Sequence, residues 1–135
     1  MVKLREWKLI RDMINVRPEL VVDAIEEAMR RVNEKHYEDF FRDEPFTDEE
    51  RRRLSKLLIE KCGNVVSEEG VEMCILEALK DFGNFTGEAF EKFTTEYADT
   101  VEWIMSDIFL KELDNIIRDY YRSYFHELAK EILFE

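Results

Sequence analysis

The chain has 135 residues, of which 45% are hydrophobic, so it can form one packed core and is not expected to be disordered. It contains only four Gly and two Pro, too few for the many turns of an all-β fold. Its net charge of −12 repels phosphate backbones, which disfavours direct binding to DNA or RNA. Nucleotides held through Mg²⁺, or a basic partner protein, remain compatible with this charge.

The N-terminal residues carry charges in every turn and include no apolar stretch typical of a signal peptide. No uncharged run is long enough to span a bilayer, so we expect a cytoplasmic protein without membrane contact. The two cysteines, Cys62 and Cys74, have neither metal-binding nor redox-motif spacing. Because each has apolar neighbours, we expect two buried free thiols.

Apolar residues between Leu4 and Ile14 recur at helical spacing and predict a first helix that ends before Pro18. Proline suits the first turn of a helix, so Pro18 is expected to open a second helix that extends to about Phe41. The expected buried stripe of this second helix consists of Val21, Ile25, Ala28 and Val32.

The segment Thr47–Glu50 has the pattern of a capping box, in which the Thr47 hydroxyl accepts from the Glu50 amide while Glu50 reaches back. It predicts a third helix that stops at Gly63. Ser67 is the expected cap of a fourth helix, and acidic residues then occupy a first turn where the helix dipole favours them.

Residues 88–135 contain no Gly or Pro and predict either one very long helix or two helices with a break near Phe109. The fold expected is an all-α bundle of about five to six helices in a single domain. Residues 1–45 would form an N-terminal helical pair, and residues 47–135 a bundle that carries a candidate acidic site. A long helix cannot bury its apolar stripe against itself, so we expect a dimer or another homo-oligomer.

Two acidic patterns could carry chemistry. Glu68, Glu69 and Glu72 form an E-E-x-x-E pattern, and Glu96 and Asp99 form an E-x-x-D pattern. Acids at positions i and i+3 or i+4 share one face of a helix, so each segment could present its carboxylates together. Two such helices side by side would offer four or five carboxylates to one or two Mg²⁺ ions.

This pair of patterns resembles the signature of the all-α nucleoside triphosphate pyrophosphohydrolases, which include MazG-type enzymes, dimeric dUTPases and phosphoribosyl-ATP pyrophosphohydrolase. The resemblance covers about residues 66–108. It implies a Mg²⁺-dependent nucleotide pyrophosphohydrolase, or a degenerate relative, that cleaves between the α and β phosphates. By position it implies that Glu68 or Glu69, Glu72, Glu96 and Asp99 are the metal ligands. Residues 1–62 do not match the usual N-terminal portion of that family.

The same acids have structural explanations. Glu68 and Glu69 can complement the helix dipole, Glu72 can pair with a basic residue of another helix, and Glu96 and Asp99 can lie on a solvated flank. The alternative function is therefore a non-enzymatic interaction module that binds a partner protein or itself through its acidic surface and aromatic C-terminal helix. The aromatic residues concerned are Tyr120, Tyr121, Tyr124 and Phe125, which suit a ligand-stacking surface, a core or a dimer seam. The basic run Arg51–Arg53 is expected to be a solvated helical face.

Overall fold

The computed structural model describes residues 4–36, 40–41, 44–82 and 104–123, together with residues 127 and 130. Over these ranges the protein is all-α, with five packed helices and no strand, which confirms the expected fold class. The first four helices are α1 (Trp7–Val16), α2 (Pro18–Lys35), α3 (Asp48–Cys62) and α4 (Glu68–Phe82). The C-terminal helix consists of η1 (Ile104–Phe109), α7 (Leu110–Ile116) and η2 (Ile117–Tyr121), of which η1 and η2 are π-helical.

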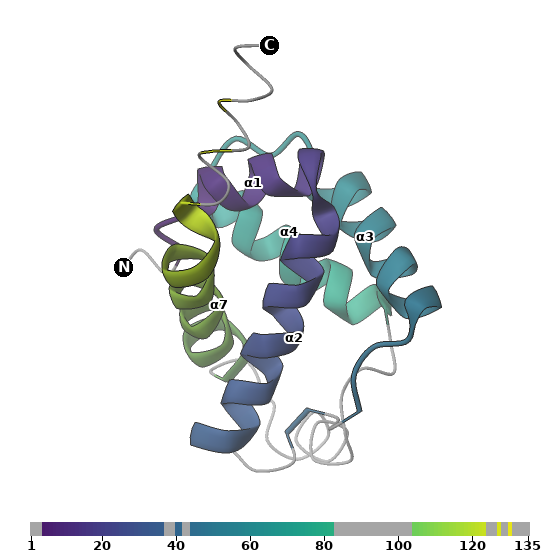
Figure 1. Cartoon of the computed structure of the whole chain (residues 1–135), viewed down its shortest axis with the longest axis vertical. Coiled ribbons are helices and arrows are strands. Elements are labelled where there is room, and N and C mark those ends of the chain that lie inside the picture. Colours follow the sequence, from purple (N-terminus) through teal and green to yellow (C-terminus); the bar gives the residue numbers. More distant parts are fainter. Residues whose placement is uncertain are drawn as a thin grey trace.

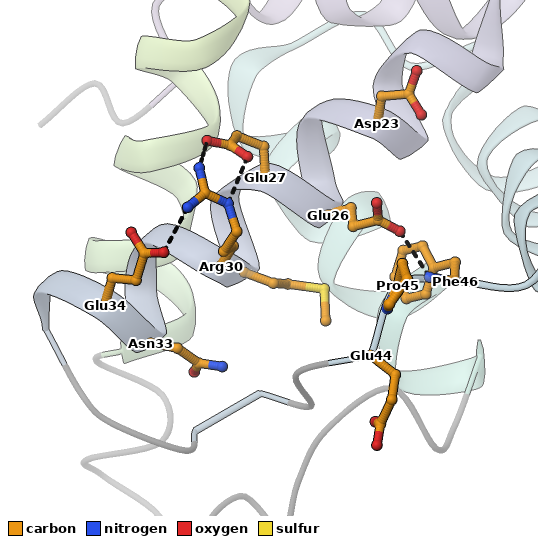
Figure 2. A pocket seen from close by; sticks show the side chains of 10 residues that line it. Asp23, Glu26, Glu27, Arg30, Asn33, Glu34, Glu44, Pro45 and Phe46 are labelled. Atoms are coloured by element: carbon orange, nitrogen blue, oxygen red, sulfur yellow. Dashed lines mark hydrogen bonds and ion pairs between the residues drawn. The ribbon is translucent and has the colours of Figure 1, made fainter.

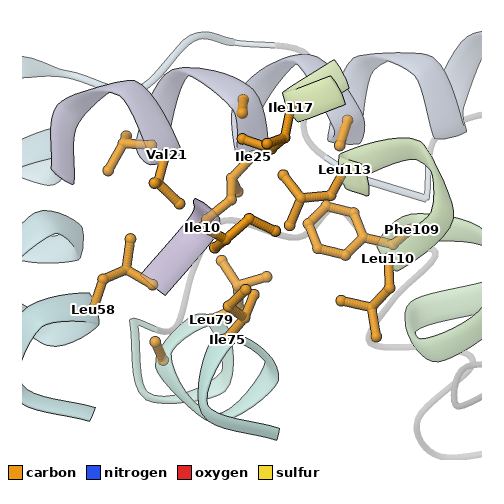
Figure 3. Packing of buried hydrophobic residues seen from close by; sticks show 14 of the residues in the cluster. Ile10, Val21, Ile25, Leu58, Ile75, Leu79, Phe109, Leu110, Leu113 and Ile117 are labelled. Atoms are coloured by element: carbon orange, nitrogen blue, oxygen red, sulfur yellow. The ribbon is translucent and has the colours of Figure 1, made fainter. Parts of the chain in front are cut away.

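Figure 1 shows α2 running through the middle of the bundle, with α3 on one side and α7 on the other. Helix α1 crosses one end of α2, and α4 lies behind it. All five helices contribute to one hydrophobic cluster, in which Ile10, Ile25, Leu58, Ile75 and Leu113 are fully buried (Figure 3). Burying one such side chain contributes about 1.5–3 kcal/mol, so this cluster is the main stabilising element of the fold.

The local signals for helix ends are largely confirmed. Pro18 occupies the first turn of α2. Thr47 and Glu50 form both hydrogen bonds of the capping box that opens α3. The Ser67 hydroxyl accepts from the Gly70 amide at 3.0 Å, as expected of the residue that caps α4. The predicted stripe of α2 is entirely buried.

The predicted end of α2 is wrong, because the helix stops at Lys35 rather than near Phe41. The Asn33 side chain accepts from the Phe41 amide at 2.8 Å and donates to the Phe41 carbonyl at 2.7 Å. These two bonds satisfy the backbone of Phe41 outside a helix. They hold Phe40 and Phe41 where both rings are buried, and Phe41 packs against Phe109 of η1.

Of the two alternatives for residues 88–135, the one with a break near Phe109 does not occur within the described residues. Phe109 has φ −62° and ψ −48°, so the chain stays helical as it passes from η1 into α7. The structure marks the position differently, by a change from π-helical to α-helical hydrogen bonding. Most of the remainder of residues 88–135 lies outside the described ranges.

The expectation of free thiols is also wrong, because Cys62 and Cys74 form a disulfide. Both residues are buried as predicted. The chain reverses between α3 and α4 and brings the Cα atoms of the two cysteines to 5.5 Å, a separation that suits a disulfide. Disulfides persist chiefly in oxidising compartments and in hyperthermophile cells, so the cytoplasmic placement stays a prediction. No helix in the described ranges has the length and apolar character needed to cross a bilayer.

Candidate functional site

The three glutamates of the E-E-x-x-E pattern lie in the first two turns of α4, but they do not share one environment. Glu68 and Glu72 are half-buried, whereas Glu69 is exposed. Glu68 Oε1 accepts from the Leu4 amide at 3.4 Å, and Glu72 Oε1 is shielded from solvent. Two of the three carboxylates are therefore held partly out of solvent, while the third is exposed.

The other two predicted ligands, Glu96 and Asp99, lie outside the described residues. Whether the two acidic patterns converge thus remains a prediction. Within the part of the chain that the structure describes, no group of three or more His, Cys, Asp or Glu side chains is arranged to hold a metal ion.

A carboxylate that the sequence reasoning did not single out, Asp114 of α7, has a clear structural role. It is only 4% exposed, and its Oδ1 accepts from the Glu6 amide at 2.8 Å. Helix α1 has no side-chain cap of its own, so Asp114 caps it from another helix. Burial raises the pKa of Asp114, while the hydrogen bond from the Glu6 backbone opposes that shift.

The outward face of α2 carries a second group of carboxylates, each with its own partners. Glu27 binds Arg30, whose guanidinium also reaches Glu34 (Figure 2). The hydrogen bond from Arg30 lowers the pKa of Glu27, which therefore stays ionised near neutral pH. Asp23 pairs with Arg51 of α3.

Glu26, on the same face, binds the backbone and not only a cation. Its Oε2 accepts from the Phe46 amide at 2.8 Å (Figure 2). The same oxygen lies 3.7 Å from Arg51. Together with Asp23 and Glu27 it lines a hollow of about 370 Å³ between α2 and the residues that precede α3.

A hollow of about 510 Å³ opens between the same face of α2 and the C-terminal helix. We call it the tyrosine groove, and its lining residues are Asp23, Glu26, Glu27, Ile116, Tyr120 and Tyr121. The two tyrosines are consecutive residues of the π-helical turn η2. Such turns are rare and are frequently found at functional sites.

Tyr120 is the most accessible part of this groove, with 65% of its surface exposed. The Arg31 guanidinium lies over its ring, 5.6 Å from the centroid, and donates to its hydroxyl at 3.3 Å. Tyr121 is half-buried, and burial, together with the charge of Glu27, raises the pKa of its hydroxyl. The groove thus combines three carboxylates with two tyrosine rings, a set that suits a cationic ligand.

Comparison of this chain with protein-family models, curated proteins and solved structures found no match.

The sequence contains a signal for the acidic side of the tyrosine groove. Asp23, Glu26 and Glu27 have the i, i+3, i+4 spacing that drew attention to the acids of α4. They also fall on the face of α2 opposite its apolar stripe. The sequence also marks Tyr120 and Tyr121 as candidates for stacking. Because they are far from α2 in the sequence, their position in the same groove as the three carboxylates could not be predicted.

Proposed function

We propose that this protein is an interaction module whose tyrosine groove binds a cationic segment of a protein partner. The observation that carries the proposal is the contact of Arg31 with Tyr120, beside three carboxylates that line the same hollow. It is an intramolecular version of the contact that an arginine or lysine of a partner would make.

The free energies expected of these contacts indicate weak, exchangeable binding. A cation over an exposed tyrosine contributes about 0.5–1 kcal/mol, and each exposed ion pair about 0–1 kcal/mol. With one such ion pair at each of the three carboxylates, these contacts sum to about 4 kcal/mol at most, which corresponds to a dissociation constant on the order of millimolar. A well-packed tyrosine is the kind of residue that dominates an interface, so Tyr120 is expected to matter most.

The test uses fluorescence anisotropy with a short labelled peptide in which lysines and arginines flank one isoleucine. We expect saturable binding to the wild type and about tenfold weaker binding to Tyr120→Ala, the loss expected of one interface tyrosine. Met73→Ala is the matched control, since Met73 is also an exposed apolar side chain but lies on α4. Equal binding by the wild type and Tyr120→Ala, or equal binding of a peptide with glutamates in place of its basic residues, would contradict the proposal.

A second candidate function is Mg²⁺-dependent hydrolysis of a nucleoside triphosphate. It is favoured by the half-buried positions of Glu68 and Glu72 one turn apart on α4. Partly buried carboxylates of this kind would supply hard oxygen ligands for Mg²⁺. The family resemblance implies that Glu96 and Asp99 would complete such a site.

Calorimetric titration with Mg²⁺ and Mn²⁺, alongside thermal melting, tests this candidate. Saturable binding that raises the melting temperature should vanish in the Glu72→Gln, Asp99→Asn double variant. It should persist in Glu77→Gln, a control at an exposed position of the same helix. No binding at millimolar metal would overturn this candidate and leave the tyrosine-groove proposal unaffected.

A further inference from the structure

A third hollow, of about 590 Å³, lies between the first turn of α2 and the outward face of α3. We call it the basic groove. Three basic side chains, Arg51, Arg52 and Lys56, line it together with the 46%-exposed side chain of Ile59 and two acidic side chains, Glu19 and Asp48. The stretch from Arg51 to Lys61 holds five of the chain's 20 basic residues and a single acid, Glu60. It is a concentrated positive region on a chain whose net charge is −12.

The basic groove and the tyrosine groove adjoin the same face of the molecule. Figure 1 shows α2 between α3 and α7, and the grooves lie on these two sides of α2. The Arg51–Asp23 ion pair joins a lining residue of one groove to a lining residue of the other. The basic groove offers Arg52 and Lys56 beside the exposed Ile59. The tyrosine groove offers the exposed Tyr120 beside carboxylates whose arginine partners belong to the same chain and could be exchanged.

We infer that the partner of the tyrosine groove is the basic groove of a second copy of this chain, in a two-fold symmetric dimer. The inference rests on the proposed function of the tyrosine groove. A two-fold axis lying in this face, roughly along α2, exchanges the two sides of α2. It therefore sets the basic groove of each copy against the tyrosine groove of the other, and the complementary contact forms twice.

Charge complementarity is the reason for choosing a second copy. A foreign cationic segment would fill the tyrosine groove and leave the basic groove unmatched, whereas a second copy matches both. Ile59 and Tyr120, two of the exposed large hydrophobic side chains, would be covered in the same step. The like net charges of the two copies oppose association over long distances, but at about 0.15 M salt this repulsion is screened beyond about 8 Å.

The test is sedimentation velocity of the full chain over micromolar concentrations at that salt concentration. The wild type is expected to dimerise. Arg52→Glu with Lys56→Glu, and separately Asp23→Lys with Tyr120→Lys, should each weaken association at least tenfold. Lys8→Glu with Lys111→Glu is the control, because it changes the net charge as much as the first variant at exposed positions that line neither groove. Circular dichroism verifies that each variant is folded.

Mixing the two groove variants provides the decisive measurement. In a dimer of either variant with itself, each contact sets two grooves of like charge against each other. In the mixed dimer, the two reversed grooves face each other and the two native grooves face each other, so both contacts are complementary. A heterodimer should therefore form in the mixture at concentrations where each variant alone is monomeric. A wild type that stays monomeric, or a dimer that persists in both variants, would overturn the inference.

The peptide assay separates this inference from the wider proposal. A variant with Arg52→Ala and Lys56→Ala, which removes two cations of the basic groove without adding acidic residues, should bind the labelled cationic peptide more tightly than the wild type, because a second copy no longer occupies its tyrosine groove. If the wild type binds the peptide but never dimerises, the proposed recognition of a cationic partner is supported, and the inference that a second copy is the partner is overturned. If the mixed variants form a heterodimer but no protein binds the peptide, the inferred dimer is supported, and the proposed recognition of other cationic segments is overturned.

Discussion

The junction of α1, α4 and α7 differs from the outward face of α2 in what its carboxylates bind. At the junction, Asp114 and Glu68 accept from the backbone amides of Glu6 and Leu4, which lie just before or at the start of α1. On α2, Asp23 and Glu27 pair with arginine side chains at partly exposed positions. Hydrogen bonds to a charged group contribute about 1.5–3 kcal/mol, whereas exposed ion pairs contribute about 0–1 kcal/mol. The junction is thus expected to contribute most to stability. The outward face of α2 is expected to provide contacts that a partner can exchange.

The largest effect should come from the disulfide that joins α3 to α4 beside this junction. Replacing both cysteines by alanine should lower the free energy of unfolding by about 3 kcal/mol, since the bridge closes a loop with a sequence separation of 12. Urea denaturation of the wild type, with and without reductant, provides the comparison. The double variant should be insensitive to reductant and should bind the cationic peptide like the wild type. An unchanged urea midpoint would contradict the assigned role of the bridge.

Asp114→Ala should destabilise the protein by about 2 kcal/mol, because the Glu6 amide loses its acceptor at a buried position. Asp12→Ala is the matched control, since Asp12 is an exposed aspartate of α1 and its removal should cost less than about 0.5 kcal/mol. Chemical denaturation of both variants measures the difference. Similar losses in the two would show that Asp114 does not fix the start of α1.

The pH dependence of stability should reveal the burial of Asp114. Its folded-state pKa is raised above the ordinary value of 3.8, so the native state binds more protons than the unfolded state in the interval above 3.8. Stability therefore falls as the pH rises through that interval. Asp114→Asn removes this contribution, so the stability advantage of the wild type over the variant should shrink as the pH rises from about 3.8 towards neutrality. A constant difference between the two proteins would contradict the raised pKa.

Arg30→Ala should have the smallest effect on stability, about 0.5 kcal/mol or less, and salt should reduce it further. Arg30 bridges Glu27 and Glu34 at an exposed position of α2. Because Glu27 also lines the tyrosine groove, removing Arg30 leaves more negative charge there. The cationic peptide should accordingly bind about twofold more tightly, by the magnitude of one exposed ion pair. Weaker peptide binding would argue that Arg30 organises the groove and does not compete with the ligand.

Features that depend on neighbouring residues in the chain could be predicted from the sequence. The capping box at Thr47, the Ser67 cap and the buried stripe of α2 follow from local spacing, and the structure contains all three. The half-buried positions of Glu68 and Glu72 also follow from helical periodicity.

Features that depend on distant contacts could not be predicted. The early end of α2 requires Asn33 to bind Phe41, and the disulfide requires the chain reversal that aligns Cys62 with Cys74. Residues from distant parts of the chain likewise line the tyrosine groove, because α2 packs beside a π-helical turn of the C-terminal helix. Neither the packing of these helices nor the π-helical turn can be predicted from the local pattern of apolar residues.

The bridge between α3 and α4 has a consequence for the integrity of the chain. A protease that cut once between Cys62 and Cys74 would leave both pieces covalently attached, and Val66, with 81% of its surface exposed, lies in that interval. The two fragments would migrate separately on a gel only after reduction. The same interval could therefore be opened to receive an inserted sequence or new chain ends, with the bridge keeping the two helices together.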